Sequence, residues 1–459
     1  MAYVLFTPVG GHDPIASFHD GAVLHICRVY RPEKVYLYLS HEMLERSRLD
    51  DRYRVSLQKL QEQLGYTIRE LHLIERDELT QVQLFDAFYT DFDQILREIH
   101  AQDPESTLLV NLSSGTPAMK SALNVISVLS QYPMQAVQVS TPNQRENPKE
   151  DDPHQYDVDL FWDCNQDNEP NFTNRCREVK GEHLLVKIKK ESIQRLLHAY
   201  NYRAALMLAQ DIEAFMPDEA MKMLRAAECR LQLDQSGYAK AMKGVEHKFM
   251  PIEMGNQRRV FEYVLGLQIK MQQGNYADFL RGLTPVVMDI FELCLKDRLR
   301  ITLDEFCRRD YEGSYRVSVD VMKQSEMGQQ ILKALQNGFQ TLEITEGYVG
   351  SMTILKIFED MSSETALLDD LRQMREIETR IRNVAAHEIV SVTSEWIHRK
   401  TGMSPENILK LLKRLVISAG IKVKAEYWHS YEDMNAVISS SILGEEPVSY
   451  THLTLPTKA

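Results

Sequence analysis

The chain has 459 residues, of which 44% are hydrophobic and 26% charged, and its formal net charge is −13. Its length exceeds what one small core needs and predicts two or three domains. The acidic balance argues against a protein that coats nucleic acid through a broad basic surface, although it is compatible with a local basic cleft.

Other sequence-wide features point to a cytoplasmic protein. Apolar runs stay well below the roughly 20 residues of a membrane span, and the first residues have no pattern of a secretion signal. The six cysteines are scattered, without the paired spacing of a zinc site, so we expect reduced thiols and no metal.

The first 165 residues alternate short apolar runs with amphipathic segments. Strands are predicted at Tyr3–Thr7, Lys34–Leu39, Glu70–Ile74, Thr107–Asn111, Gln135–Val139 and Asp157–Trp162, with helices between them such as Ser56–Leu64 and Leu84–Ile99. This alternation predicts an α/β domain with a parallel sheet of the Rossmann-like kind. Ligands of such sheets bind outside the carboxyl ends of the strands.

Two polar loops follow predicted strands. The first reads Thr-Pro-Val-Gly-Gly-His-Asp-Pro-Ile over residues 7–15, and the second reads Asn-Leu-Ser-Ser-Gly-Thr-Pro-Ala-Met over residues 111–119. Backbone N–H groups and hydroxyls at the start of the helix after the second loop can hold phosphates or ribose. The alternative is a loop that only caps a helix and turns the chain. Neither loop has the glycine spacing of a dinucleotide site or the Gly-Lys-Ser/Thr of a P-loop, which leaves a dehydrogenase or an NTPase poorly supported.

From about residue 185 the pattern is helical. Residues 192–215 have the pattern of a helical hairpin, and further helices are predicted at Asp218–Leu233, Tyr238–Phe249, Gln257–Gln272, Tyr276–Asp297, Gly328–Asn337, Ser351–Glu359, Glu364–His387 and Ser404–Ala419, with a short strand at Ile421–Tyr427. We predict an α/β domain over 1–170, a helical linker domain over 171–255 and an all-α domain over 256–447. The last stretch, 448–459, resembles translated adapter sequence and is predicted to be non-native.

The helix predicted over Glu364–His387 ends in Arg-Asn-Val-Ala-Ala-His, residues 382–387. A histidine can move protons at a 2′-hydroxyl or a leaving oxygen, and an arginine can hold the charge of a phosphorane. On one helix, Arg382 and His387 point roughly 140° apart, whereas Asn383 and His387 share a face. We therefore expect a site shared by two copies across a two-fold axis. The alternative is an ordinary amphipathic helix with a solvated arginine and a packed histidine. Arg375 lies seven residues before Arg382 on the same face and is a further candidate contact for RNA.

The string Arg-Asn-x-x-Ala-His resembles the catalytic motif of HEPN ribonucleases, and the two N-terminal loops resemble those of CARF domains. Together, in this order, they resemble the accessory ribonucleases of type III-A (Csm) CRISPR systems. The resemblance implies Arg382 as phosphate stabiliser, His387 as proton-transfer group and Asn383 as orienter. It implies ligand contacts by Gly11, His12, Asp13, Asn111, Ser113, Ser114, Gly115, Thr116 and Met119.

The function that this resemblance implies is a metal-independent endoribonuclease in antiviral defence. A cyclic oligoadenylate, with the hexamer favoured and the tetramer as the alternative, would activate a homodimer that cuts single-stranded RNA and leaves 2′,3′-cyclic phosphate ends. The CARF pocket would also cut the ring slowly. No cofactor, membrane or DNA partner is expected. Two other classes stay open: a non-catalytic nucleotide sensor that signals through its helical domain, and an enzyme that turns over a nucleotide in the α/β domain.

Overall fold

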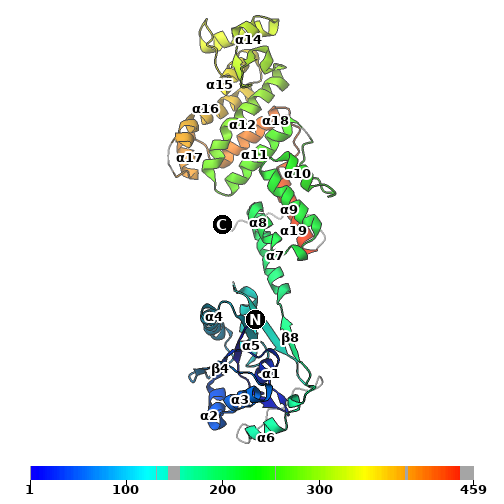
Figure 1. Ribbon diagram of the computed structural model, residues 1–459. Helices are drawn as coiled ribbons and strands as arrows, with labels where there is room; N and C mark the ends of the chain where they lie inside the picture. The colour runs from blue at the N-terminus through cyan, green and yellow to red at the C-terminus, as the bar shows by residue number, and fades with distance from the viewer. Residues whose placement is uncertain (1, 131, 143–155, 254, 388–390, 445–459) are drawn as a thin grey trace. The chain divides into compact units, whose positions relative to one another are not determined.

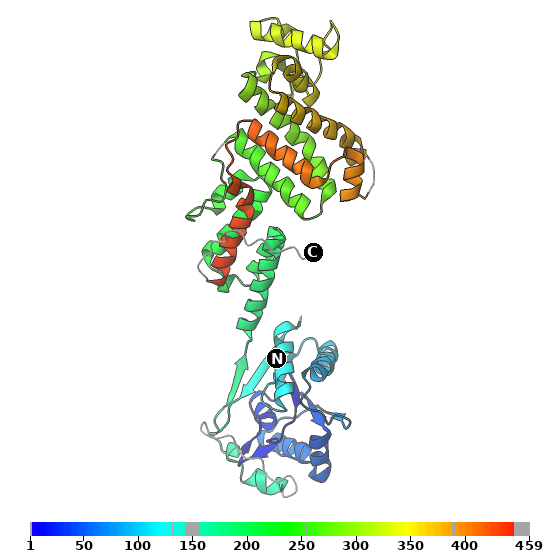
Figure 2. The same ribbon diagram turned by 180° about the vertical axis from the view of Figure 1, so that it is seen from behind.

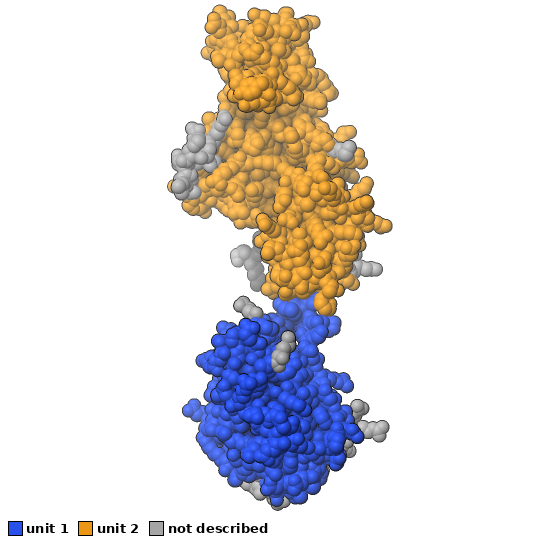
Figure 3. Space-filling view, viewed as in Figure 1, with its two compact units in different colours: residues 1–188 blue, residues 189–459 orange. Residues whose placement is uncertain are grey.

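The computed structural model describes residues 2–130, 132–142, 156–253, 255–387 and 391–444, and the side chains of 382–387 lie outside what it describes. The chain divides into two compact units, residues 1–188 and 189–459 (Figure 3). Each is described by itself. None of the described helices combines the length and the apolar character needed to cross a membrane.

The first unit is built on a six-stranded sheet (Figure 1). Its strands, in spatial order, are β5 (Glu70–Arg76), β4 (Lys34–Ser40), β1 (Tyr3–Pro8), β6 (Thr107–Asn111), β7 (Met134–Val139) and β8 (Cys176–Val179). The first five are parallel, and β8 pairs antiparallel with β7 at the edge. The Rossmann-like α/β fold predicted from the sequence is confirmed, with one antiparallel edge strand added.

Helices cover both faces of this sheet because its strands β1, β4 and β6 are apolar on both sides. Along β1, Val4 and Phe6 pack with α4 (Phe85–Gln102) and α5 (Pro117–Leu129). Leu5, which points the other way, packs with α1 (Ala22–Tyr30), α2 (His41–Asp50) and α3 (Arg52–Leu64). The alternation of successive side chains along a strand therefore builds two separate cores.

The predicted strand at Asp157–Trp162 is wrong, because Val158–Asp163 forms helix α6. The carboxylate of Asp157 accepts hydrogen bonds from the backbone N–H groups of Asp159 and Leu160, both at 3.1 Å. These bonds satisfy the donors of the first helical turn. A small hairpin of β2 (Ile15–Ala16) and β3 (His19–Asp20) follows the first loop and was not predicted.

The second unit is helical, as predicted. Its main helices are α7 (Glu182–His198), which begins in the first unit, α8 (Tyr202–Gln210), α9 (Asp218–Leu231), α10 (Gln235–Ala241), α11 (Asn256–Gln272), α12 (Tyr276–Cys294), α14 (Glu326–Phe339), α15 (Ser351–Met361), α16 (Thr365–His387), α17 (Ser394–Thr401), α18 (Pro405–Ser418) and α19 (Ser430–Leu443). A hairpin of β9 (Cys307–Arg309) and β10 (Tyr315–Val317) interrupts them.

Two elements predicted in this unit differ from the structure. The strand predicted at Ile421–Tyr427 is wrong, because these residues form an irregular segment that ends in a 3₁₀ turn at Ala425–His429. The helix predicted at Tyr238–Phe249 stops at Ala241, since the chain turns through Gly244 with a φ of +80°. Such a backbone conformation cannot continue a right-handed helix.

The last helix, α19, returns to pack against α9 (Figure 2). Arg230 of α9 is fully buried, donates to the two carboxylate oxygens of Glu262 at 2.8 and 3.1 Å, and donates to the carbonyl of Ser430 at 3.1 Å. Three segments distant in sequence thus share one buried ion pair. The predicted domain boundaries at 170 and 255 stay predictions, and a cut at 255 would separate Arg230 from both of its partners.

Candidate functional site

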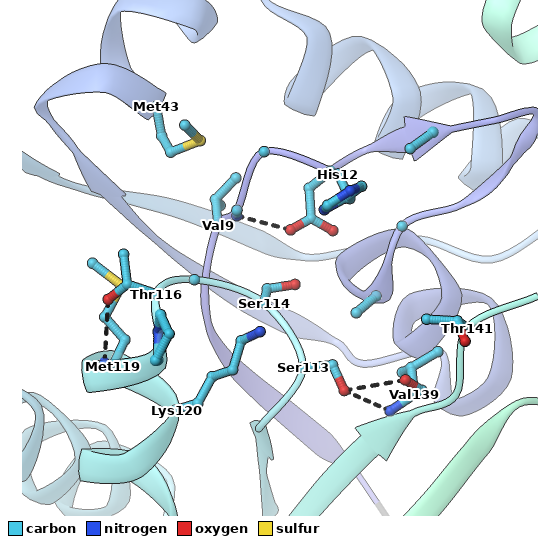
Figure 4. Close-up of a pocket in the computed structure, with 18 of the residues that line it drawn as sticks. Val9, His12, Met43, Ser113, Ser114, Thr116, Met119, Lys120, Val139 and Thr141 are labelled. Carbon is cyan, nitrogen blue, oxygen red and sulfur yellow. Dashed lines mark hydrogen bonds between the residues drawn. The ribbon is translucent and has the colours of Figure 1, made fainter. Parts of the chain in front are cut away.

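A cavity of about 570 Å³ opens at the carboxyl ends of β1 and β6 (Figure 4). From β1 the chain runs outward to β4 and β5, and from β6 it runs the other way to β7. The cavity therefore lies where the strand order reverses, which is where open α/β sheets bind ligands. The predicted residues that line it are Gly11, His12, Asp13, Ser113, Ser114, Gly115, Thr116 and Met119.

The two loops touch each other at glycines. A Cβ on Gly10 would lie 2.8 Å from the backbone nitrogen of Gly115, and Gly115 itself has a φ of +83°. A Cβ on Gly115 would also meet the Met119 sulfur at 2.8 Å. Side chains at either position would force the loops apart, so these glycines fix the floor of the cavity.

Asn111 does not line the cavity but braces its floor. It is fully buried, and its amide nitrogen donates to Thr7 Oγ1 and Ser114 Oγ, both at 2.9 Å. Its amide oxygen accepts from the backbone N–H of Ser113 at 2.8 Å. These three bonds tie the ends of β1 and β6 to the second loop. The predicted contact of Asn111 with a ligand stays a prediction, while its hydrogen bonds give it a positioning role.

Asp13 is turned inward in a similar way. Its carboxylate accepts from the backbone N–H of Gly10 at 2.9 Å and from that of Val23, near the start of α1, at 3.0 Å. Burial raises the pKa of this carboxyl above its ordinary value, and the two backbone hydrogen bonds oppose that rise. Asp13 thus holds the first loop against α1, and His12 beside it lines the cavity.

The hydroxyls of the second loop are also engaged within the protein. Ser113 Oγ accepts from the backbone N–H of Val139 at 2.7 Å, and Thr116 Oγ1 donates to the carbonyl of Val82 at 2.7 Å. Thr116 is the N-cap of α5, where its side chain accepts from the N–H of Met119. The loop therefore presents a preformed surface to the cavity.

Several lining residues were not predicted. Lys120, one residue beyond the predicted motif, lines the cavity together with Glu42, Met43, Val139, Thr141 and Arg175. Lys120 was detectable from sequence as a cation in the helix that the second loop opens. Arg175 was not, because it comes from a segment more than fifty residues farther along the chain.

Beside the cavity lies a buried cluster of Asp20, His25 and Asp167, whose possible ligand atoms all lie within 4.8 Å of one another. Two arginine side chains form ion pairs with the carboxylates of this cluster. Arg28 Nε donates to Asp20 at 2.6 Å, and Arg175 Nη2 donates to Asp167 at 2.7 Å. His25 Nε2 accepts from the backbone N–H of Arg175 at 3.0 Å. With these cations in place, the cluster is an ion-pair network that fixes Arg175 and the start of β8 to α1.

In the helical unit, Arg382, Asn383 and His387 belong to the last turns of α16, which ends at His387. Their side chains lie outside the described residues, so their predicted roles stay predictions. Arg375 is described. Its side chain is 16% exposed, and Nη1 lies 3.0 Å from Glu378 Oε2, which also accepts from Ser351 Oγ at 2.6 Å. Arg375 is thus held by a buried carboxylate, and its predicted contact with RNA stays a prediction.

Comparisons with known proteins agree with this architecture. Family models match the Cas_Csm6 CARF domain over residues 70–176, the Csm6 6H domain over 179–231 and the Cas_Csm6 HEPN domain over 249–439. The chain is 29% identical to the Streptococcus thermophilus CRISPR system endoribonuclease Csm6′ over 307 residues, 66% of this chain and 75% of that protein.

A solved structure shares the fold. The structure of Enterococcus italicus Csm6 bound to cyclic hexa-2′-fluoro-hexa-dAMP matches with a TM-score of 0.72 at 19% identity, covering 96% of this chain and 100% of that one. The CRISPR system endoribonuclease Csm6 of Mycobacterium tuberculosis is 31% identical over 420 residues, which span 90% of this chain and 94% of that protein. With likeness at this level along almost its whole length, the chain belongs to the Csm6 family of CRISPR endoribonucleases.

Proposed function

We propose that this protein is a cyclic oligoadenylate-activated, metal-independent endoribonuclease that acts as a cytoplasmic homodimer in type III CRISPR antiviral defence. The observation that carries the proposal is the preformed cavity at the strand-order reversal of a CARF-like domain, in a chain whose α16 ends in the HEPN motif. A ligand activates such a protein only if it binds the active arrangement better than the resting one.

The proposed chemistry uses no metal. The 2′-oxygen of the RNA attacks the adjacent phosphorus, and the bond from phosphorus to the 5′-oxygen breaks. The 2′-hydroxyl gives up a proton and the 5′-oxygen gains one, which leaves a 2′,3′-cyclic phosphate and a 5′-hydroxyl. His387 would transfer a proton, Arg382 would stabilise the charge of the phosphorane, and Asn383 would orient the histidine ring.

The helical backbone of residues 382–387 supports a shared site. On a regular helix the Arg382 and His387 side chains point roughly 140° apart, so two copies of α16 are needed to bring such groups to one phosphate. Mixing wild-type subunits with subunits of an inactive variant tests this. A shared site predicts that activity falls with the fraction of mixed dimers, and full activity in those dimers would exclude it.

The activating ligand is proposed to be cyclic hexa-adenylate, with cyclic tetra-adenylate as the alternative. Support comes from the E. italicus Csm6 structure, whose ligand is a cyclic hexanucleotide analogue. Slow cutting of the ring in the CARF pocket belongs to the same proposal. There His12 lines the cavity, and its imidazole would transfer the proton.

Cleavage of a fluorescent single-stranded RNA in EDTA tests the proposal, with and without each ring, for the wild type and for His387→Ala. We expect activity that appears with one ring, persists in EDTA and is lost in the variant. A wild-type rate that neither ring changes would refute activation and favour a non-catalytic sensor or a nucleotide-processing enzyme. Loss of activity in EDTA would refute metal independence.

A further inference from the structure

The cavity is lined by few charged groups, and most of them are already paired. Glu42 binds Arg46 at 2.7 Å, and both oxygens of Asp13 accept from backbone N–H groups. Arg175 donates to Asp167 at 2.7 Å and to the carbonyl of Ser140 at 3.0 Å. Asp20 belongs to the buried cluster described above and accepts a hydrogen bond from Arg28. These groups shape the wall of the cavity, and their charges are compensated within the protein.

Lys120 is the exception. Within the described part of the chain, no carboxylate lies within ion-pair distance of its amino group, and its side chain is half-buried at the cavity. Figure 4 shows the side chain pointing away from α5 toward the loop that carries Ser113 and Ser114. The ammonium group therefore points toward the floor of the cavity. The neighbouring hydroxyls of Ser113, Ser114 and Thr116 already form hydrogen bonds within the protein.

Its position on the helix makes this lysine unusual. Lys120 is the fourth residue of α5, which is capped by Thr116 and has no acidic residue in its first turn. The N-terminal end of a helix carries a partial positive charge, so a cation there is disfavoured. An anion bound between the helix start and the ammonium group would be attracted by both.

We propose that Lys120 is the phosphate-binding cation of this cavity and contacts a bridging phosphate of the cyclic oligoadenylate. The inference rests on the proposed function and adds to it the group that recognises the charge of the ligand. In the proposed homodimer the two copies supply two ammonium groups to one ring. Specificity follows from spacing, because only a ring whose phosphates match the two lysines engages both at once.

Binding of cyclic hexa-adenylate to the full-length protein, measured by titration calorimetry at several salt concentrations, tests this. Lys120→Met removes the charge with little change in length, Lys120→Arg keeps it, and Lys180→Met removes an exposed charge of the same unit outside the cavity. Because the variant dimer would present neither ammonium group to the ring, we expect Lys120→Met to weaken binding by about 30- to 100-fold. The slope of log K against log salt should become shallower by up to about 1.4. Lys120→Arg should bind within about 10-fold of the wild type, and Lys180→Met should match it.

The thermal midpoint of the ligand-free variants separates binding from folding. Lys120→Met should melt no lower than the wild type, because it removes a cation from the positive end of α5. Wild-type affinity and salt slope in Lys120→Met would overturn the inference alone. Failure of the wild type to bind either the hexa- or the tetra-adenylate ring would overturn the proposed ligand and this inference together.

Discussion

Replacing Asn111 with alanine tests whether the cavity floor is held by hydrogen bonds within the protein. The variant deletes both donor bonds to Thr7 and Ser114 and removes the acceptor of the Ser113 backbone N–H. Asn111 is fully buried, so water cannot easily replace these partners. The second loop should open far more often, although no atom of Asn111 lines the cavity.

The expected change in the free energy of opening the second loop follows from the loss of these three hydrogen bonds. At about 1 kcal/mol for each, their loss lowers the free energy of opening the loop by about 3 kcal/mol, and the orphaned N–H of Ser113 acts in the same direction. Since 1.4 kcal/mol corresponds to a factor of ten, the loop should open about 100 times more often. Binding of the ring should weaken as well, because the competent loop must first re-form.

Hydrogen exchange followed by mass spectrometry on the full-length protein measures this opening. We expect peptides covering the second loop to exchange about 100-fold faster in Asn111→Ala, with the Ser113 amide most affected. Asn124→Ala is the matched control, because Asn124 lies half-exposed on α5 and does not line the cavity. It should exchange like the wild type.

One result would refute the bracing role. If the second loop of Asn111→Ala exchanged at the wild-type rate while its affinity for the ring fell, Asn111 would act by touching the ligand. The contact predicted from sequence would then be right, and the inward arrangement of hydrogen bonds would not explain the effect.

Two further predictions concern buried charges. Arg230→Met leaves Glu262 buried without its cation and should destabilise the helical unit by about 3–5 kcal/mol. Urea unfolding followed by tryptophan fluorescence measures this loss. The double variant Arg230→Met with Glu262→Leu should recover most of it, and a double variant as unstable as Arg230→Met would contradict the reasoning. Asp20 is the second case. Burial alone would raise the pKa of this carboxyl, but hydrogen bonds from His25 and Arg28 outweigh burial and hold the pKa below its ordinary value of 3.8. A depressed folded-state pKa stabilises the protein at neutral pH and loses that contribution as pH falls below about 4. Asp20→Asn should therefore flatten the dependence of the unfolding free energy on pH in that range. An unchanged pH profile would show that the hydrogen bonds of Asp20 with His25 and Arg28 do not contribute to stability.

Local patterns were enough to find most of the secondary structure. Continuous apolar runs marked β1, β4 and β6, because a strand covered on both faces needs such a segment. Strands β5 and β7 were found from shorter apolar segments interrupted by polar residues. The same reasoning failed at 157–162, where a carboxylate that caps a helix start outweighed the alternation. It failed again at 421–427, where Ile421 is buried and Lys422 and Lys424 are exposed, as in a strand, but the described chain places no strand beside them.

Some features of the site could also be predicted from the sequence, and others could not. The sequence by itself determined the family and the two loops, because the Arg-Asn-x-x-Ala-His string and the loop residues are contiguous. Tertiary structure decided which loop side chains face the cavity. Asn111 lies outside the cavity lining and Asp13 lines the cavity, but both side chains are taken up by hydrogen bonds to backbone N–H groups. Arg175 reaches the cavity from a distant segment. Contacts of this kind depend on strand order and on which polar groups are left without partners after packing, and neither can be read from neighbouring residues.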